Sequence, residues 1–115
     1  MQKNIYGKTS EIIAANFLKK KGYKILAMNY KNKIGEIDII AKDQKCIVFV
    51  EVKARSSKAF GHPLEAINNE KQLKIRRVAE LYLITKHLTD NPCRFDAISI
   101  LGTEDYEIEH IENAF

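Results

Sequence analysis

The stretch GEIDIIAKDQKCIVFVEVKAR, residues 35–55, decides the fold. Two runs rich in Ile and Val, at roughly 34–42 and 46–55, flank the short polar segment Asp43-Gln44-Lys45. So short a connection between two β-branched runs predicts an antiparallel hairpin. Three carboxylates and an ammonium nevertheless lie inside these strands, where a buried hairpin would favour Val and Ile. That placement of charge requires an explanation.

Strand geometry places these charges together. Side chains alternate across a strand, so Glu36 and Asp38 share one face of the first strand, and Glu51 and Lys53 share one face of the second. A two-residue loop would set Asp38 opposite Glu51 and Glu36 opposite Lys53. If the loop shifts by one residue, the four groups stay on one face but lie nearly diagonally across the two strands. A three-residue loop weakens the direct pairing. The register stays open at this point.

Opposed carboxylates repel, and partial burial raises the cost because an uncompensated carboxylate resists leaving water. A divalent cation offsets that cost: Mg²⁺ takes one or two carboxylates, keeps several waters and leaves room for a phosphate. A neighbouring Lys can then stabilise the charge that develops on a reacting phosphate. The alternative is a surface ladder of ion pairs, in which Glu36 pairs with Lys53, and Asp38 with Arg55 or Lys33.

The remaining elements follow from periodicity and breakers. Residues 9–21 and 64–88 predict helices, the first capped by Thr9 or Ser10 and stopped by Gly22, the second starting near Pro63 after a loop at 56–63. Further strands are predicted at 23–31, 94–101 and 105–111. The order α-β-β-β-α-β-β predicts a single α/β domain over residues 1–115, with a central mixed sheet flanked by helices.

Composition excludes several classes of protein. No apolar run is long enough to span a membrane, and no signal peptide is visible, so we expect a cytoplasmic protein that does not bind membranes. Cys46 and Cys93 form no CxxC pair and predict buried, reduced thiols. His62, His87 and His110 are too scattered for a metal cluster.

Charge is divided unevenly along the chain. The first 100 residues hold all 19 Lys and Arg against 10 acids, whereas the last 15 residues hold five acids and no Lys or Arg. The net charge of +4 therefore combines a basic body with an acidic tail. A basic body suits a polyanionic partner such as nucleic acid, although surface lysines also serve solubility.

The charged pattern resembles a known signature. Asp38, followed by Glu51-Val52-Lys53, resembles the D…ExK active site of the PD-(D/E)XK nuclease superfamily. The wider chain resembles the small YraN-like bacterial family, which is similar to archaeal Holliday-junction resolvases in its nuclease core. The similarity covers nearly the whole chain and includes, among other segments, Gly22-Tyr23-Lys24-Ile25-Leu26, Asn29-Tyr30, Phe49-Val50-Glu51-Val52-Lys53, Arg94-Phe95-Asp96 and Asn113-Ala114-Phe115.

The resemblance implies a restriction-endonuclease-like α-β-β-β-α-β core and an Mg²⁺ or Mn²⁺ site. By that resemblance, Asp38, Glu51 and the Val52 backbone carbonyl are metal ligands, Lys53 is the catalytic lysine, and Glu11 enters the same site from the first helix. Helical spacing independently places Glu11 on the apolar stripe of Ala15 and Leu18, although a first-turn acid also complements the helix dipole. Many relatives have Gly where this chain has Ser10, which we interpret as a change of cap; the alternative is that it alters how Glu11 enters the site.

Basic residues on the second predicted helix suggest a phosphate-binding surface. Lys71 falls on the stripe Leu64, Ile67, Lys71, Ile75, Val78, Tyr82, where it could reach a phosphate at the metal site or lie at the helix edge with its head in water. Lys74, Arg76 and Arg77 form a basic patch, and Arg55 lies on the face of Glu51; we assign all five to nucleic-acid binding. Arg94 and Asp96 share a strand face and predict a structural ion pair.

The sequence therefore predicts a metal-dependent endonuclease acting on DNA, with structured or branched DNA as the expected substrate and a homodimer as one possible assembly, since two cuts need two sites. The main alternative is a non-catalytic nucleic-acid-binding or partner-scaffolding module on the same fold. An Mg²⁺-dependent enzyme for small phosphoesters is disfavoured, because no Gly-rich phosphate loop is present.

Overall fold

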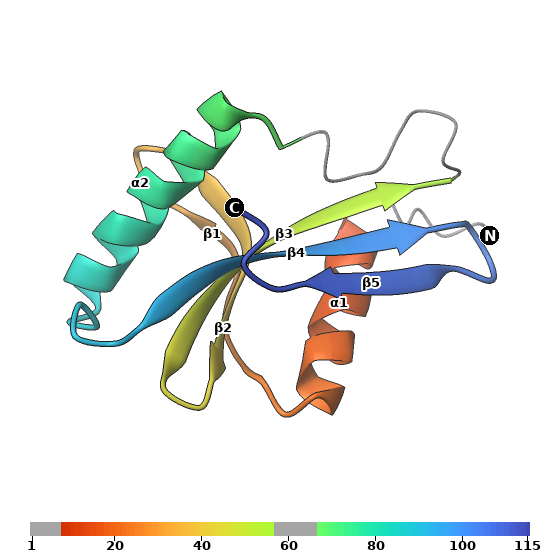
Figure 1. Cartoon of the computed structure of the whole chain (residues 1–115), viewed down its shortest axis with the longest axis horizontal. Helices are drawn as coiled ribbons and strands as arrows, with labels where there is room; N and C mark the ends of the chain where they lie inside the picture. Colours follow the sequence, from red (N-terminus) through yellow and green to blue (C-terminus); the bar gives the residue numbers. More distant parts are fainter. Residues whose placement is uncertain (1–7, 57–66) are drawn as a thin grey trace.

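The fold is a five-stranded mixed sheet flanked by two helices (Figure 1). The computed structural model describes residues 8–56 and 67–115. Its helices are α1 (Lys8–Lys20) and α2 (Asn69–Thr85), and its strands are β1 (Lys24–Lys31), β2 (Glu36–Asp43), β3 (Cys46–Arg55), β4 (Cys93–Leu101) and β5 (Glu107–Ile111). The predicted order of elements and the α/β class are confirmed.

The strands lie in the order β1-β2-β3-β4-β5. Only the β3–β4 pair is parallel among the described strands, and α2 provides the crossover that a parallel connection needs. Asp43 pairs with Cys46, which confirms the two-residue loop at Gln44-Lys45. Gln44 has a φ of 58°, the left-handed conformation that tight hairpin turns use.

Each face of the sheet carries its own apolar core, which a helix covers. Buried residues on the α1 face are Ala14, Ala15, Leu18, Tyr23, Ile39, Ala41, Val48, Val50, Ile98 and Ile100. Buried residues on the α2 face are Ile37, Ile40, Ile47, Phe49, Ile75, Val78, Ala79, Tyr82 and Phe95. Figure 1 shows α1 and α2 on opposite sides of the sheet. A side chain within the sheet therefore normally meets one helix only.

Helix α1 ends where the sequence predicted, but it begins earlier than predicted. The helix begins at Lys8, so Thr9 and Ser10 lie within its first turn and neither is the cap that the sequence predicted. Gly22 does end the helix: its φ is 95°, and the Tyr23 amide donates to the Leu18 carbonyl at 3.0 Å. This left-handed residue turns the chain directly into β1.

Helix α2 is shorter than predicted at both ends. Asn68 caps it, because its side-chain oxygen accepts a hydrogen bond from the Lys71 amide at 2.9 Å, and Ile67 therefore precedes the helix. The predicted start at 64 was wrong for this reason, while Leu64, Pro63 and most of the predicted loop lie outside the described residues. The helix ends at Thr85 rather than 88, since His87 adopts a φ of 59°.

The sheet divides at its centre. Strands β2 and β3 pair from Asp43–Cys46 only as far as Ile39–Val50. Beyond that point β2 continues beside β1 to Glu36, and β3 continues beside β4 to Arg55. Figure 1 shows β3, β4 and β5 running together away from β1 and β2. The fork leaves Asp38 and Glu51 at the point of separation, where both helices can reach them.

Candidate active site

A pocket of about 490 Å³ lies at the fork, and charged groups from four elements line it. Helix α1 supplies Glu11, strand β2 supplies Asp38, strand β3 supplies Glu51 and Lys53, and helix α2 supplies Lys71. We call this site the acidic pocket. Its other lining residues are Ser10, Val52, Ala54, Arg55 and Ser56.

The Asp38 side chain bridges the two strands at the fork. One carboxylate oxygen accepts a hydrogen bond from the Val52 backbone amide at 2.8 Å, just beyond the last β2–β3 pair. The side chain thus satisfies an amide that a regular ladder would have paired with backbone. This contact fixes the position of the Asp38 carboxylate and brings it beside the Glu51-Val52-Lys53 segment.

Glu51 is the most buried acid of the pocket, with 5% of its surface exposed. Its Oε2 atom lies 3.2 Å from the Lys71 ammonium and 3.7 Å from the Lys53 ammonium. Burial and the neighbouring Asp38 charge raise the pKa of Glu51 to about 7, although both lysines oppose that rise. Two cations therefore do not fully compensate the carboxylates at this site.

The two lysines have unequal pKa values. Burial and the adjacent Lys71 ammonium lower the pKa of Lys53. Burial alone also lowers the pKa of Lys71, but its contacts with Lys53 and Glu51 raise it overall. The pKa of Lys53 thus falls and that of Lys71 rises, because Lys53 is the more buried of the two and Lys71 lies closer to Glu51.

Glu11 reaches the pocket from the other face of the sheet. Burial and the negative charge of Asp38 raise its pKa, while a hydrogen bond with the Asn29 side chain lowers it in part. The Oε1 atom of Glu11 is buried and has no hydrogen-bond partner among the described residues. A buried, unpaired carboxylate oxygen is costly unless a ligand satisfies it.

The residues present fit a hard divalent cation. Side chains of His, Cys, Asp and Glu form no ready-made cage of three within residues 8–56 and 67–115. Mg²⁺, however, needs only one or two carboxylates beside its waters, and these are oxygen ligands of the kind found here. Asp38 and Glu51 supply two such carboxylates, and Glu11, whose Oε1 has no partner among the described residues, lines the same pocket.

The structure separates the five basic residues assigned to nucleic-acid binding. Lys71 and Arg55 line the acidic pocket, and Arg55 donates to its neighbouring carbonyl of Ala54 at 3.0 Å. Lys74 and Arg77 lie beside it, in a second pocket that Lys71 also lines. Arg76 has its guanidinium 4.6 Å from the centre of the Phe95 ring and lines a further pocket together with Arg77. Of the five predicted residues, Lys71 and Arg55 therefore line the acidic pocket, and the other three lie along α2 outside it.

One residue at the site was missed by sequence reasoning. Asn29 hydrogen-bonds Glu11 from strand β1, whereas Ser10, which the sequence had already linked to the entry of Glu11, lines the acidic pocket. Asn29 was part of the family pattern, but nothing in the sequence connected it to the hairpin. Its φ of 50° sets it apart from the rest of β1 and is visible only in the structure. Glu36, by contrast, is exposed, and its backbone lies opposite Lys31 in the β1–β2 ladder.

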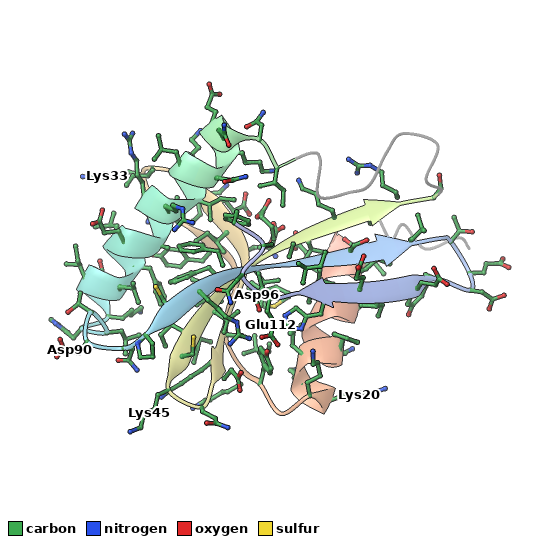
Figure 2. The ribbon with its side chains drawn as sticks, in the orientation of Figure 1. Lys20, Lys33, Lys45, Asp90, Asp96 and Glu112 are labelled. Carbon is green, nitrogen blue, oxygen red and sulfur yellow. The ribbon has the colours of Figure 1, made fainter. Side chains whose placement is uncertain are left out.

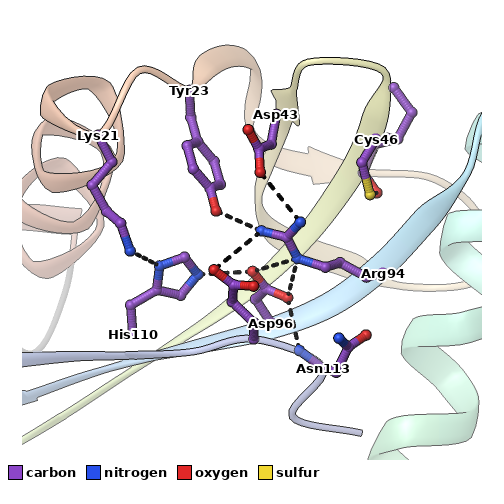
Figure 3. Close-up of polar contacts among 10 residues, drawn as sticks. Lys21, Tyr23, Asp43, Cys46, Arg94, Asp96, His110 and Asn113 are labelled. Carbon is purple, nitrogen blue, oxygen red and sulfur yellow. Dashed lines mark hydrogen bonds and ion pairs between the residues drawn. The ribbon is translucent and has the colours of Figure 1, made fainter.

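A second charged cluster lies away from the pocket, around Arg94 and Asp96 (Figure 3). The Arg94 Nε donates to Asp96 Oδ1 at 3.0 Å, which confirms the predicted ion pair. Asp96 also contacts His110 at 2.7 Å and accepts from the Asn113 amide at 3.1 Å. Arg94 reaches Tyr23 and Asp43 as well. We call this cluster the arginine network; it joins the end of α1, the β2–β3 hairpin, β4, β5 and the C-terminal residues.

The thiols differ from the prediction in one respect. Cys46 and Cys93 are both free, as expected, but Cys46 is half-buried and Cys93 is exposed. The expectation of burial was wrong for Cys93 because it occupies the first position of β4, before that strand enters the core. Neither of the two described helices is long and apolar enough to cross a membrane.

Fold and site together define an α/β protein with a carboxylate- and lysine-lined pocket at a fork in its sheet. Residues 10–100 match the model of the uncharacterised protein family UPF0102, and the chain belongs to that family. It is 50% identical to a UPF0102 protein of Alkaliphilus oremlandii over 100% of both chains, and 50% identical to one of Clostridioides difficile over 95% of each. A UPF0102 protein of Chlorobium phaeobacteroides is 45% identical, with 95% of this chain and 92% of the relative covered.

Proposed function

We propose that this protein is a divalent-metal-dependent endonuclease that hydrolyses phosphodiesters of DNA, within the PD-(D/E)XK superfamily that its D…ExK pattern resembles. One observation carries the proposal: at the fork of the sheet, Glu11, Asp38, Glu51, Lys53 and Lys71 converge from four elements on one pocket. No packing requirement explains five charged side chains at the centre of an apolar sheet. A phosphodiester and its counter-cation require both signs of charge in one place.

Asp38 and Glu51 would hold Mg²⁺ or Mn²⁺, together with the Val52 carbonyl, and Glu11 offers a further oxygen. When bound, such a cation supplies positive charge to the phosphate oxygens and makes water a stronger nucleophile. The Val52 amide fixes Asp38, so the carboxylates need little rearrangement to bind it. The raised pKa of Glu51 fits an acid that lacks sufficient positive charge.

The lysines have separate tasks in this proposal. Hydrolysis places additional negative charge on the phosphoryl oxygens, and ammonium groups that face them stabilise it. Lys71, whose pKa is raised, binds a phosphate oxygen at the mouth of the pocket, where 39% of its side chain is exposed. Lys53 is more deeply placed, with 16% of its side chain exposed, and it donates a hydrogen bond to the reacting phosphate or orients the attacking water.

The direct test is cleavage of labelled linear, flapped and four-way DNA with Mn²⁺. We expect cleavage that Asp38→Ala and Lys53→Met each abolish. Glu36→Gln is the matched control, because Glu36 is an exposed acid on the same strand as Asp38. A preference for four-way DNA would extend the proposal to branched substrates and to a dimer, which light scattering would detect. Equal product from wild type and Asp38→Ala on all three substrates would exclude catalysis here.

A non-catalytic nucleic-acid-binding module is the second candidate, and one contact favours it. Lys71 already lies 3.2 Å from Glu51, so the carboxylate has a cationic partner without any metal. Calorimetric titration separates the two candidates. The nuclease binds Mn²⁺ and loses that binding in Glu51→Gln, whereas the binding module shows no such heat while still retaining DNA.

A further inference from the structure

A second pocket adjoins the acidic pocket along helix α2. It has a volume of about 700 Å³, and its lining residues are Ile34, Asn68, Glu70, Lys71, Leu73, Lys74 and Arg77. Lys71 lines both pockets, so the two are neighbours at that side chain. We call this second pocket the α2 groove. Its volume lies in the range that small organic ligands occupy.

Hydrogen bonds and close packing fix the wall of the α2 groove. The β1–β2 turn forms one side, and the Asn32 side chain fastens it: Oδ1 accepts from the Ile34 amide at 2.9 Å and Nδ2 donates to the Val78 carbonyl on α2 at 3.4 Å. Gly35 lets α2 approach closely, since a Cβ there would lie 3.2 Å from Val78 and 3.5 Å from the Lys74 stem. The turn and the helix therefore keep a fixed separation.

The lining combines apolar surface with positive charge. Ile34 and Leu73 provide the apolar part, and Leu73 is 53% exposed. Lys71, Lys74 and Arg77 provide three positive charges against the single carboxylate of Glu70. Cations alone would suit the phosphates of any duplex. The apolar surface beside these cations suits a ligand that also presents a flat, weakly polar face.

We propose that the α2 groove binds one unpaired nucleotide of the DNA strand whose adjoining phosphodiester lies in the acidic pocket. Its base lies against Ile34 and Leu73, and its phosphate binds Lys74 and Arg77. This inference rests on the proposed nuclease function, since it takes the strand through both pockets. Bases in a duplex are stacked and cannot present a face to side chains, so the substrate class is DNA with unpaired nucleotides beside the cleavage site.

The test measures binding of fluorescein-labelled pentathymidylate by anisotropy, in EDTA so that the metal site does not contribute. We expect Leu73→Ala to weaken binding about threefold to tenfold, the effect of losing apolar contact with a base. Ile84→Ala is the matched control, because Ile84 is 54% exposed on the same helix but lies outside both pockets. Arg77→Gln should weaken binding as well.

An abasic oligomer of the same length separates base from phosphate recognition. It should bind wild type more weakly than pentathymidylate does, lose no further affinity in Leu73→Ala, and still respond to Arg77→Gln. Equal binding of the two oligomers, equal effects of Leu73→Ala and Ile84→Ala, or no binding of pentathymidylate to wild type would each overturn the inference.

These outcomes are distinguishable from failure of the nuclease proposal. Calorimetry on Leu73→Ala should give the wild-type affinity for Mn²⁺, because Leu73 does not line the acidic pocket. Cleavage that depends on Asp38 with no contribution from Leu73 refutes the groove alone. Binding of pentathymidylate that depends on Leu73, without Asp38-dependent cleavage, refutes the nuclease and with it the passage of one strand through both pockets.

Discussion

The protein buries acidic side chains in two places, and their pKa values shift in opposite directions. Asp96, in the arginine network, is fully buried, and the hydrogen bonds from His110 and Arg94 lower its pKa despite the burial. Glu51, in the acidic pocket, is nearly as buried, yet its pKa rises to about 7 because burial and Asp38 outweigh its two lysines. Burial alone therefore does not set the state of a carboxylate; the number and geometry of its partners do.

The two clusters also differ in how completely their polar atoms are paired. Figure 2 shows Asp96 near the centre of the molecule, while Lys20, Lys33, Lys45 and Asp90 project from its periphery. Every oxygen of Asp96 has a partner, and the network links parts of the chain distant in sequence. In the acidic pocket one oxygen of Glu11 has no partner among the described residues. Incomplete satisfaction costs stability, and a binding site is where such a cost is retained.

The largest predicted effect is on the stability of the arginine network. Asp96→Asn should lower the free energy of unfolding by about 3 kcal/mol, because it leaves the Arg94 guanidinium without its buried counter-charge. Urea unfolding followed by circular dichroism measures the loss. Asp38→Asn is the matched control and should cost far less, since an amide oxygen can still accept from Val52. Equal costs at the two positions would remove the contrast between the clusters.

The two clusters should also respond to pH with opposite signs in metal-free protein. Glu51 binds its proton more tightly in the folded state, so its contribution to stability is present below pH 4.5 and is lost as the pH rises to about 7. A tenfold change in proton affinity is worth about 1.4 kcal/mol, so a rise of the pKa from 4.5 to about 7 amounts to roughly 3 to 4 kcal/mol. Asp96 has a lowered pKa, so its contribution is present above its ordinary value and is lost as acid protonates the folded state.

Variants isolate each contribution from the other carboxylates of the chain. The difference in unfolding free energy between wild type and Glu51→Gln should shift in favour of the variant between pH 4.5 and about 7. The difference between wild type and Asp96→Asn should shrink only at the acid end. Parallel pH profiles for the two differences would show that both acids experience the same environment.

Much of this arrangement could be predicted from the sequence. The β-branched runs and Gly22 were sufficient for the hairpin and the end of α1, because they are local and depend on few residues. The register stayed open in the sequence, and the pairing in the structure stops at Ile39–Val50, before Asp38 and Glu51 could face each other directly. The Arg94–Asp96 pair was predictable for the same reason, since two positions on one strand share a face. Asp38 and Glu51 do line one pocket, but strict alternation failed along β2, since Ile37 and Ile39 lie in opposite cores and Glu36 is exposed outside the pocket.

Other features depend on contacts between distant segments, which no local pattern encodes. The fork of the sheet arises because β2 follows β1 while β3 follows β4, and neither strand's own sequence specifies the separation. His110 and Tyr23 join Arg94 and Asp96 across the fold, so the network beyond the ion pair was not foreseeable. The α2 boundary failed because the Asn68 side chain caps the helix where the apolar spacing continued.

Metal binding offers a third test of the comparison. Mn²⁺ at one hundred times its Kd should stabilise wild type by about 2.7 kcal/mol, since it binds the folded protein only. Glu51→Gln should lose this stabilisation, whereas Glu36→Gln and Asp96→Asn should keep it, because neither residue lines the acidic pocket. Thermal unfolding with and without Mn²⁺ measures the shift. Stabilisation that persists in Glu51→Gln would place the metal elsewhere.

The smallest predicted effect concerns Lys71, whose ammonium lies 3.2 Å from Glu51 Oε2. An ammonium and a dication on one carboxylate repel each other, so Lys71→Met should tighten Mn²⁺ binding about threefold to tenfold, equivalent to about 1 kcal/mol. Calorimetry measures the affinity, and Lys74→Met is the control because Lys74 does not line the acidic pocket. If Glu51 and Lys71 were instead a permanent ion pair, like Arg94 and Asp96, removing the lysine would leave the buried carboxylate with only the more distant Lys53, at 3.7 Å. Lys71→Met would then lower the stability of the protein and leave Mn²⁺ affinity unchanged, and the acidic pocket would be a second structural network rather than a site.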